Sequence, residues 1–244
     1  MKVVILAAGY ATRLYPLTKS FPKPLLEVGA RSIIDRLVDD VDSTGKAREY
    51  VVVSNALFAG HFREWASKKR LSAAITVLDD GSVSNETRLG AVADILFAMR
   101  SLSIDEDMLV MAGDNVLDFS LSSFISYAEK KPGSCAMRYY EPDVKRLRRS
   151  GVANVDEDDR MTEMVEKPEN PASNWCVVPF YYYKAADLET LSRAVDEGCA
   201  VDAPGSALAW LGNRKDVYLM PMPGKRYDIG TLEDYESVRA AKWL

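Results

Sequence analysis

The sequence predicts an α/β protein built on a doubly wound, mostly parallel mixed sheet that carries an antiparallel extension. Up to Ala112, short apolar segments alternate with segments whose apolar residues recur at helical spacing, as in parallel strands joined by helices. From Ser134 onward, short strands alternate with polar turns, which is typical of antiparallel pairing. We expect this second part to lie over a ligand cleft.

The first strand is predicted at 3–6, where every residue is apolar, as in a strand covered on both faces. Apolar residues at helical spacing predict helices at 33–41 and 92–99. A capping sequence from Thr231 to Asp234 opens the last helix. The remaining elements are predicted as strands at 50–53, 74–78, 108–112, 135–140, 152–155, 161–165, 176–183 and 217–220, and as helices at 58–69, 185–197 and 205–211.

Size and composition indicate one domain over residues 1–244, without a linker or a low-complexity tract. The formal net charge of −5 argues against a general binder of nucleic acid, and the basic run at 145–149 is predicted to be a solvated turn. No segment is apolar for long enough to span a membrane, and the chain begins directly in a strand. The three cysteines lack the spacing of a zinc site. We therefore expect a cytoplasmic protein with no membrane or nucleic-acid partner.

The loop after the first strand has the composition of a phosphate-binding turn. Its small residues leave backbone N–H groups uncovered, so an anion can approach them closely, and Arg13 and Lys23 add positive charge. The loop follows the carboxyl end of a central strand, where sheets of this class bind ligands. An ordinary turn with two solvated cations is the structural alternative.

Neither of the two best-known phosphate motifs is present in this loop. The chain has no G-x-x-x-x-G-K-[ST], which excludes a Walker loop. A dinucleotide fingerprint needs a third small residue that opens a helix, whereas Leu14 stands there and Pro16 follows. We therefore expect an extended loop.

Asp114 follows Gly113 at the carboxyl end of the apolar strand predicted at 108–112, and so faces the same edge of the sheet as the loop. A carboxylate in this place could hold Mg²⁺, which favours one or two carboxylates together with phosphate oxygens. An Asx-turn residue that ends the strand is the alternative.

The loop resembles the signature of the sugar-phosphate nucleotidylyltransferases, G-x-G-T-R-L-x-P-x-T followed by P-K-P-L. These motifs stand at residues 9–18 and 22–25, with Ala11 in place of the usual second glycine. We expect the methyl group of Ala11 to narrow the nucleotide site or to disfavour a positive φ. The resemblance continues in the family's order through G-D at 113–114, E-K-P at 166–168 and Y-D-I-G-T at 227–231, and covers nearly the whole chain.

This resemblance implies a Rossmann-like fold of the nucleotide-diphospho-sugar transferase type, in the short form without a left-handed β-helix domain. It also implies that Asp114 and Asp228 hold Mg²⁺, that Lys167 holds the phosphate of a sugar phosphate and that Glu166 contacts the sugar. A helix cap is the structural alternative for Asp228. An exposed salt-bridge turn is the alternative for residues 166–168.

A second segment, at 85–91, resembles the base-reading stretch of the family. A plain helix N-terminus capped by Thr87 is the alternative, and the identity of the base stays open because the polar side chains offer both donors and acceptors. Asn174 and Trp175 are expected in the acceptor pocket, whose exact sugar also stays open. The expected substrate-binding residues are Ala8, Gly9, Tyr10, Ala11, Thr12, Asn85, Thr87, Leu89, Gly90, Glu166, Asn174 and Trp175.

These assignments predict that a sugar 1-phosphate attacks the α-phosphorus of a nucleoside triphosphate in line and that pyrophosphate leaves. Arg13, Lys23 and Lys167 are the predicted catalytic cations, because the protein's task is to align phosphates and neutralise charge. Mg²⁺ is the expected cofactor, and a homo-oligomer is compatible with the resemblance. Three alternatives stay open: a cytidylyltransferase acting on phosphocholine or another small phospho-alcohol, a glycosyltransferase, and a non-catalytic nucleotide-sugar sensor.

Overall fold

The computed structural model describes residues 1–241. These residues form two compact units, each assembled from separate stretches of the sequence. Unit 1 contains Met1–Arg88, Ala112–Ser122 and the C-terminal segment from Gly224, and unit 2 contains Leu89–Met111 and Ser123–Pro223. The single domain over 1–244 stays a prediction.

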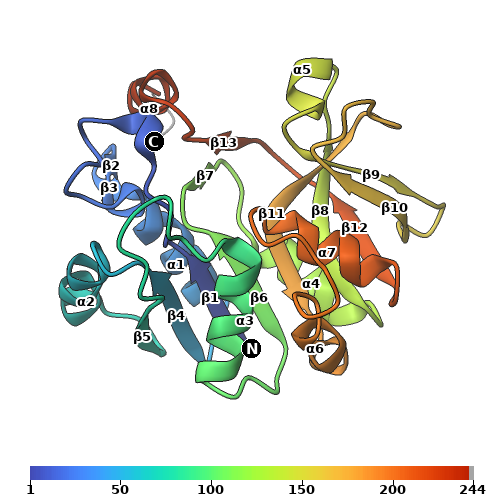
Figure 1. Cartoon of the computed structure of the whole chain (residues 1–244), viewed down its shortest axis with the longest axis horizontal. Helices are drawn as coiled ribbons and strands as arrows, with labels where there is room; N and C mark the ends of the chain where they lie inside the picture. The colour runs from blue at the N-terminus through green and yellow to red at the C-terminus, as the bar shows by residue number, and fades with distance from the viewer. Residues whose placement is uncertain (242–244) are drawn as a thin grey trace. The chain divides into compact units, whose positions relative to one another are not determined.

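Unit 1 is built on parallel strands that follow the predicted alternation of strand and helix (Figure 1). Its strand β1 pairs with β4, and β4 pairs with β5. The middle residues of β1 and β4 have no exposed surface, as expected of strands covered on both faces. The elements of unit 1 are β1 (Lys2–Leu6), β2 (Glu27–Val28), β3 (Arg31–Ser32), α1 (Ile33–Ser43), β4 (Glu49–Ser54), α2 (Ala59–Lys68), β5 (Ala74–Asp79), β7 (Asn115–Leu117), β13 (Arg226–Asp228) and α8 (Leu232–Arg239).

Unit 2 contains the antiparallel part of the fold (Figure 1). Its strand β11 pairs antiparallel with β6, β8 and β9, β10 pairs antiparallel with β9, and β12 runs parallel to β8. The elements of unit 2 are α3 (Ala91–Ser101), β6 (Met108–Ala112), α4 (Ser122–Lys130), β8 (Ser134–Tyr140), α5 (Val144–Leu147), β9 (Gly151–Val155), β10 (Met161–Glu166), β11 (Trp175–Tyr183), α6 (Ala185–Ser192), α7 (Gly205–Gly212) and β12 (Val217–Pro221). The α/β class with an antiparallel extension is confirmed, while the placement of that extension over a cleft stays a prediction.

The loop after β1 is not extended throughout, so that prediction is wrong in part. Single 3-10 turns form at Thr12–Leu14 and at Lys23–Leu25. The side chain of Leu14 is buried, and the chain must turn to insert it into the core. A short tripeptide turn has no sequence period of its own and is therefore hard to predict.

Other differences also concern short or terminal elements. The paired strands β2 with β3 and β7 with β13 contain two or three residues each, too few to show a period. The basic run predicted as a turn contains α5, whose first turn is capped by the carboxylate of Asp143. Helix α6 ends at Ser192 instead of 197. The capping sequence of α8 is confirmed, because Thr231 and Asp234 each accept a hydrogen bond from the other's backbone N–H.

One hydrophobic cluster of unit 1 joins segments that are far apart in the sequence. Leu14 from the loop, Val116 from β7 and Ile229 after β13 lie in it together with residues of α1 and α8. Leu14, Val116 and Ile229 each stand within two positions of a predicted site residue. Their burial therefore fixes the backbone on which Arg13, Asp114 and Asp228 stand.

None of the helices in residues 1–241 combines the length and the apolar character needed to cross a membrane.

Candidate active site

The carboxyl end of β1 is held in place by a buried amide from the neighbouring strand. The side-chain Nδ2 of Asn55, which follows β4, donates to the carbonyl of Ala8 at 2.8 Å. Ala8 and Tyr10 are buried, whereas Gly9 is exposed and a β-carbon built on it would meet nothing within 4 Å. The open space at Gly9 agrees with a backbone that a ligand approaches closely.

Ala11 has left-handed backbone angles, with φ 46° and ψ 45°. The carbonyl of this residue accepts hydrogen bonds from the Thr18 hydroxyl at 2.8 Å and from the backbone N–H of Leu14 at 2.9 Å. These contacts hold a conformation that glycine adopts freely and alanine adopts at a cost of about 1 kcal/mol. The expected conflict between the methyl group and a positive φ is therefore present in the structure.

Thr12 and Arg13 form an exposed 3-10 turn directly after Ala11. Within residues 1–241, the guanidinium of Arg13 makes no ion pair, in contrast to the other cation of the loop, Lys23. Arg13 is thus a solvated charge that an anionic ligand can reach.

Lys23 and Asp114 form an ion pair in which Nζ lies 2.7 Å from Oδ2. The lysine side chain is 9% exposed and the aspartate side chain 36%. Gly113 packs closely beside this pair, because a β-carbon there would lie 3.1 Å from the carbonyl oxygen of Leu6 and 3.3 Å from the ring of Pro24. The G-D pair thus places its carboxylate against the end of β1 and the P-K-P-L segment.

Asp228 belongs to the same group of charges. Its partner across the β7–β13 ladder is Asn115, the residue after Asp114, and the amide of Asn115 donates to Asp114 Oδ1 at 2.8 Å. Arg226 Nη1 lies 3.6 Å from Asp228 Oδ2 and donates to Asn115 Oδ1 at 2.7 Å. The helix-cap alternative for Asp228 is not seen, since Thr231 caps α8.

The pKa values of Asp114 and Asp228 are shifted in opposite directions. Desolvation opposes the ionisation of Asp114, but Lys23 outweighs it and holds the pKa of Asp114 below its usual value. Desolvation and the negative charge of Asp114 raise the pKa of Asp228 above its usual value. Two carboxylates that repel each other in this way favour a bound cation.

These two carboxylates fit the donor set of Mg²⁺. Mg²⁺ is usually held by one or two carboxylates and by phosphate oxygens, rather than by an all-protein cage. Within residues 1–241, no group of three or more histidine, cysteine, aspartate or glutamate side chains could hold a metal ion. The donor set is therefore of the kind that a substrate phosphate completes.

In unit 2, Glu166 ends β10 and its carboxylate lies in a space left by two glycines. A β-carbon at Gly205, the first residue of α7, would lie 2.2 Å from Glu166 Oε2, and one at Gly151 would lie 2.8 Å from it. Within residues 1–241, the carboxylate accepts no hydrogen bond, and desolvation raises its pKa above the usual value. A half-buried acceptor of this kind is available for the hydroxyl groups of a ligand.

Lys167 has a positive φ of 51°, and its backbone N–H donates to the carbonyl of Ser150 at 3.0 Å. Its Nζ lies 3.7 Å from Asp202 Oδ2, and both side chains are at least half exposed. Such a pair is weak in water. The left-handed backbone turns Lys167 away from the strand direction of β10, which is a constraint that often marks functional positions.

Asn174 and Trp175 stand at the beginning of β11. The amide of Asn174 donates to the carbonyl of Glu141 at 2.9 Å and so fixes the end of β8. The indole of Trp175 lies under the guanidinium of the buried Arg138 at 5.1 Å and packs edge-on against Tyr140 at 5.6 Å. Tyr140 is 60% exposed, so this aromatic pair faces solvent.

The predicted base-reading segment is divided between the units. Asn85 and Thr87 belong to unit 1, where the hydroxyl of Thr87 accepts from the backbone N–H groups of Val83 and Ser84. The cap at α3 is Gly90, so the alternative in which Thr87 caps this helix is wrong. Gly90, with φ 95°, packs against Val201, whose carbonyl oxygen would lie 2.6 Å from a β-carbon there. Leu89, beside it, is exposed.

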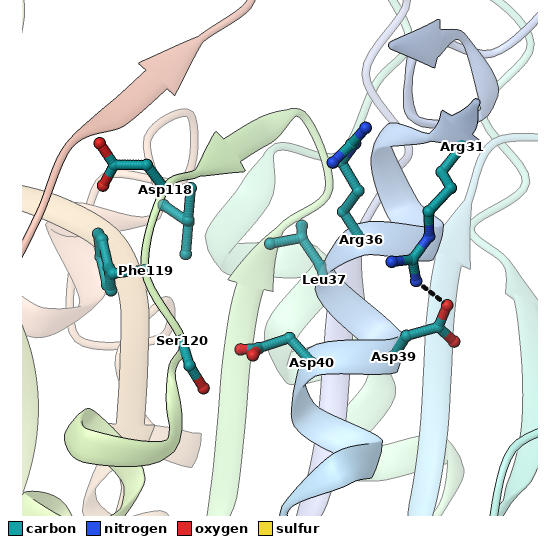
Figure 2. Close-up of a pocket in the computed structure, with 9 residues that line it drawn as sticks. Arg31, Arg36, Leu37, Asp39, Asp40, Asp118, Phe119 and Ser120 are labelled. Atoms are coloured by element: carbon teal, nitrogen blue, oxygen red, sulfur yellow. Dashed lines mark hydrogen bonds and ion pairs between the residues drawn. The ribbon is translucent and has the colours of Figure 1, made fainter. Parts of the chain in front are cut away.

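A pocket of about 440 Å³ in unit 1 lies apart from these residues, between α1 and the segment after β7 (Figure 2). Its charged groups already have partners. Arg31 pairs with Asp39, Arg36 donates to the carbonyl of Val28, and Asp40 accepts from the backbone N–H of Leu121. None of the predicted site residues lines this pocket.

Three residues near the predicted site have no counterpart in the sequence analysis: Arg226, Asp202 and Gly205. Arg226 shares one face of β13 with Asp228, its i+2 neighbour, but a strand of three residues is too short to be recognised from the sequence. Asp202 and Gly205 approach Lys167 and Glu166 only through the packing of α7 on β10, which the sequence does not display.

Comparisons with known proteins agree with the motifs. A family model described as nucleotidyl transferase matches residues 2–242. The UTP–glucose-1-phosphate uridylyltransferase AglF of Haloferax volcanii is 26% identical, over 96% of this chain and 93% of that protein. A glucose-1-phosphate adenylyltransferase of Geobacter metallireducens is 30% identical, over 70% of this chain and 43% of that protein.

A solved structure, UDP-glucose pyrophosphorylase complexed with UDP-glucose, superposes with a TM-score of 0.81. The alignment covers 98% of this chain and 96% of that chain at 22% identity, and so compares the fold alone. The resemblance drawn from the loop, G-D and E-K-P motifs is confirmed. The chain belongs to the nucleotidyl transferase family and is an enzyme of its sugar-phosphate nucleotidylyltransferase type.

Proposed function

We propose that this enzyme joins a nucleoside triphosphate to a sugar 1-phosphate, forming a nucleoside diphosphate sugar and pyrophosphate. An oxygen of the sugar phosphate attacks the α-phosphorus, a new P–O bond forms there, and the bond to the β-phosphate oxygen breaks. The observation that carries the proposal is the group formed by Lys23, Asp114 and Asp228, since it joins a phosphate-binding cation to a carboxylate pair suited to Mg²⁺.

In this proposal the residues of unit 1 act on the triphosphate. Arg13, exposed and without an ion pair in residues 1–241, contacts the phosphates, and Lys23 supports the α-phosphate or the leaving pyrophosphate. Asp114 and Asp228 would hold Mg²⁺, which supplies charge neutralisation at the phosphate oxygens. The open backbone at Gly9 admits the nucleotide.

The residues of unit 2 act on the acceptor. Lys167 binds its phosphate, because an ammonium group is a point cation suited to that ligand. Glu166 accepts hydrogen bonds from sugar hydroxyls, since its carboxylate has no donor within residues 1–241. The attacking oxygen is already anionic near neutral pH, so no general base is required.

Glucose 1-phosphate is the first acceptor to test, because AglF and the adenylyltransferase are both named for it. The two relatives differ in their nucleotide, and the base therefore has to be found by experiment. A pyrophosphate-release screen that crosses the common nucleoside triphosphates with several sugar 1-phosphates tests the proposal. Release with at least one pair, dependent on Mg²⁺, is expected.

Absence of release with every pair would contradict the proposal. Release with phosphocholine in place of sugar phosphates would replace it by the cytidylyltransferase alternative, because Glu166 would then have no sugar hydroxyls to bind.

A further inference from the structure

Arg226 lies inside the group of charges around the candidate metal ligands. Its side chain is only 15% exposed, and its Nη1 donates to Asn115 Oδ1 at 2.7 Å and lies 3.6 Å from Asp228 Oδ2. Arg226 and Asp228 are two positions apart in β13, so their side chains lie on the same face of the strand. Asn115 in turn donates to Asp114. Arg226 is therefore connected to both aspartates.

The charges of this group balance without a metal ion. Asp114 and Asp228 carry two negative charges when ionised, and Lys23 and Arg226 carry two positive ones. Neither cation is free to move into solvent, since the side chains of Lys23 and Arg226 are 9% and 15% exposed.

We infer that Arg226 is a positioning residue that holds the two aspartates in register and keeps the net charge of this group near zero, so that a divalent cation binds weakly alone. Phosphate oxygens of the nucleotide then supply the missing negative charge and ligands, and cation and triphosphate are taken up together. This inference deepens the proposed function and rests on its assignment of Asp114 and Asp228 as metal ligands.

The test is a titration of the nucleotide-free protein with Mn²⁺, a spectroscopic substitute for Mg²⁺. The concentration of free Mn²⁺ is measured at each step by electron paramagnetic resonance. The variant Arg226→Met removes the fixed charge, and Mn²⁺ is expected to bind about tenfold more tightly than to the wild type. Arg226→Lys keeps a cation in place and is expected to restore weak binding. Lys225→Met is the matched control, because it removes one charge from the exposed neighbouring position.

Tight Mn²⁺ binding by the nucleotide-free wild type would overturn the inference, as would an Arg226→Met affinity equal to that of Lys225→Met. Arg226→Gln retains a side-chain amide that can bond Asn115 and provides the neutral variant if Arg226→Met does not fold. The titration needs no turnover, so its result is separate from failure of the proposed function, which would appear as absent pyrophosphate release by the wild type.

Discussion

The charged site residues Lys23 and Asp114 of unit 1 are closely paired, whereas Lys167 of unit 2 is held only loosely by Asp202. Lys23 and Asp114 are 2.7 Å apart with a nearly buried lysine, while Lys167 and Asp202 are 3.7 Å apart with both side chains at least half exposed. In unit 1 the pairing neutralises carboxylates that would otherwise repel. In unit 2 it leaves Glu166 and Lys167 available to a ligand. The difference agrees with the proposal that unit 1 binds the multiply charged triphosphate and unit 2 the smaller acceptor.

The largest expected effect on the rate of pyrophosphate release comes from removing the carboxylate of Asp114, which pairs with Lys23. Asp114→Asn keeps the hydrogen bond from Asn115 but removes a metal-binding charge and the partner of Lys23, and we expect pyrophosphate release to fall by at least about 10³-fold. Initial rates at saturating Mg²⁺ measure it. Asp118→Asn, which follows β7 outside the group of charges, is the control and should stay within about twofold. An active Asp114→Asn enzyme would refute the metal assignment.

A smaller effect is expected from filling the space around Glu166. Gly205→Ala places a methyl group where Glu166 Oε2 now lies, so the carboxylate must move, and we expect the KM for the sugar phosphate to rise about tenfold with little change in the KM for the nucleotide.

Gly212→Ala, at the other end of α7, is the matched control for this change, because its new methyl group would meet the flexible end of Met161 and not Glu166. A combined Gly205→Ala/Glu166→Asp enzyme should recover part of the loss, since the shorter side chain leaves room for the methyl group. Additive losses in the double variant would contradict a direct contact.

The opposite pKa shifts of Glu166 and Asp114 predict that these two carboxyl groups respond differently to acid. The pKa of Glu166 is raised by desolvation, so this carboxylate takes up a proton at a higher pH than an ordinary glutamate does, and the pKa of Asp114 is lowered. On acidification, acceptor affinity should therefore weaken before Asp114 is protonated. The measurement is the pH profile of the acceptor KM in the wild type and in Glu166→Gln. The variant removes the Glu166 contribution and retains the titration of the acceptor phosphate, and identical profiles would argue against the role of Glu166.

The smallest expected effect concerns the loop of unit 1. Ala11→Gly relieves the strain that a left-handed backbone conformation imposes on alanine. We therefore expect the free energy of unfolding to rise by up to about 1 kcal/mol, as measured by urea denaturation. Ala8→Gly, at a buried position without positive φ, should lower it. A loss of stability in Ala11→Gly would show that the packing of the methyl group on the neighbouring cluster outweighs the strain.

The sequence was sufficient for the parts of the molecule that follow a period or a motif. Long apolar strands such as β1 and β4, the amphipathic helix α1 and the capping box at Thr231 all appear where their patterns predict them. Lys23 and Asp114 could also be placed at one sheet edge from strand order, and the structure brings them into contact.

What the sequence did not reveal depends on contacts between distant segments. The β7–β13 ladder aligns Asp228 with Asn115 and brings Arg226 into the group, but its strands are too short to show alternation. The same is true of Gly205, whose importance appears only once α7 packs on β10 and a β-carbon at that position meets Glu166. The roles of the predicted site residues remain proposals.

The most direct test of the central claim follows oxygen atoms through one turnover. A sugar 1-phosphate labelled with ¹⁸O at its phosphate is incubated with the nucleoside triphosphate, Mg²⁺ and the enzyme. The masses of the products are then measured by mass spectrometry. Attack by the sugar phosphate on the α-phosphorus predicts a nucleoside diphosphate sugar that keeps every labelled oxygen, together with unlabelled pyrophosphate. Label in the pyrophosphate or in free phosphate, or transfer of the sugar without its phosphate, would contradict it.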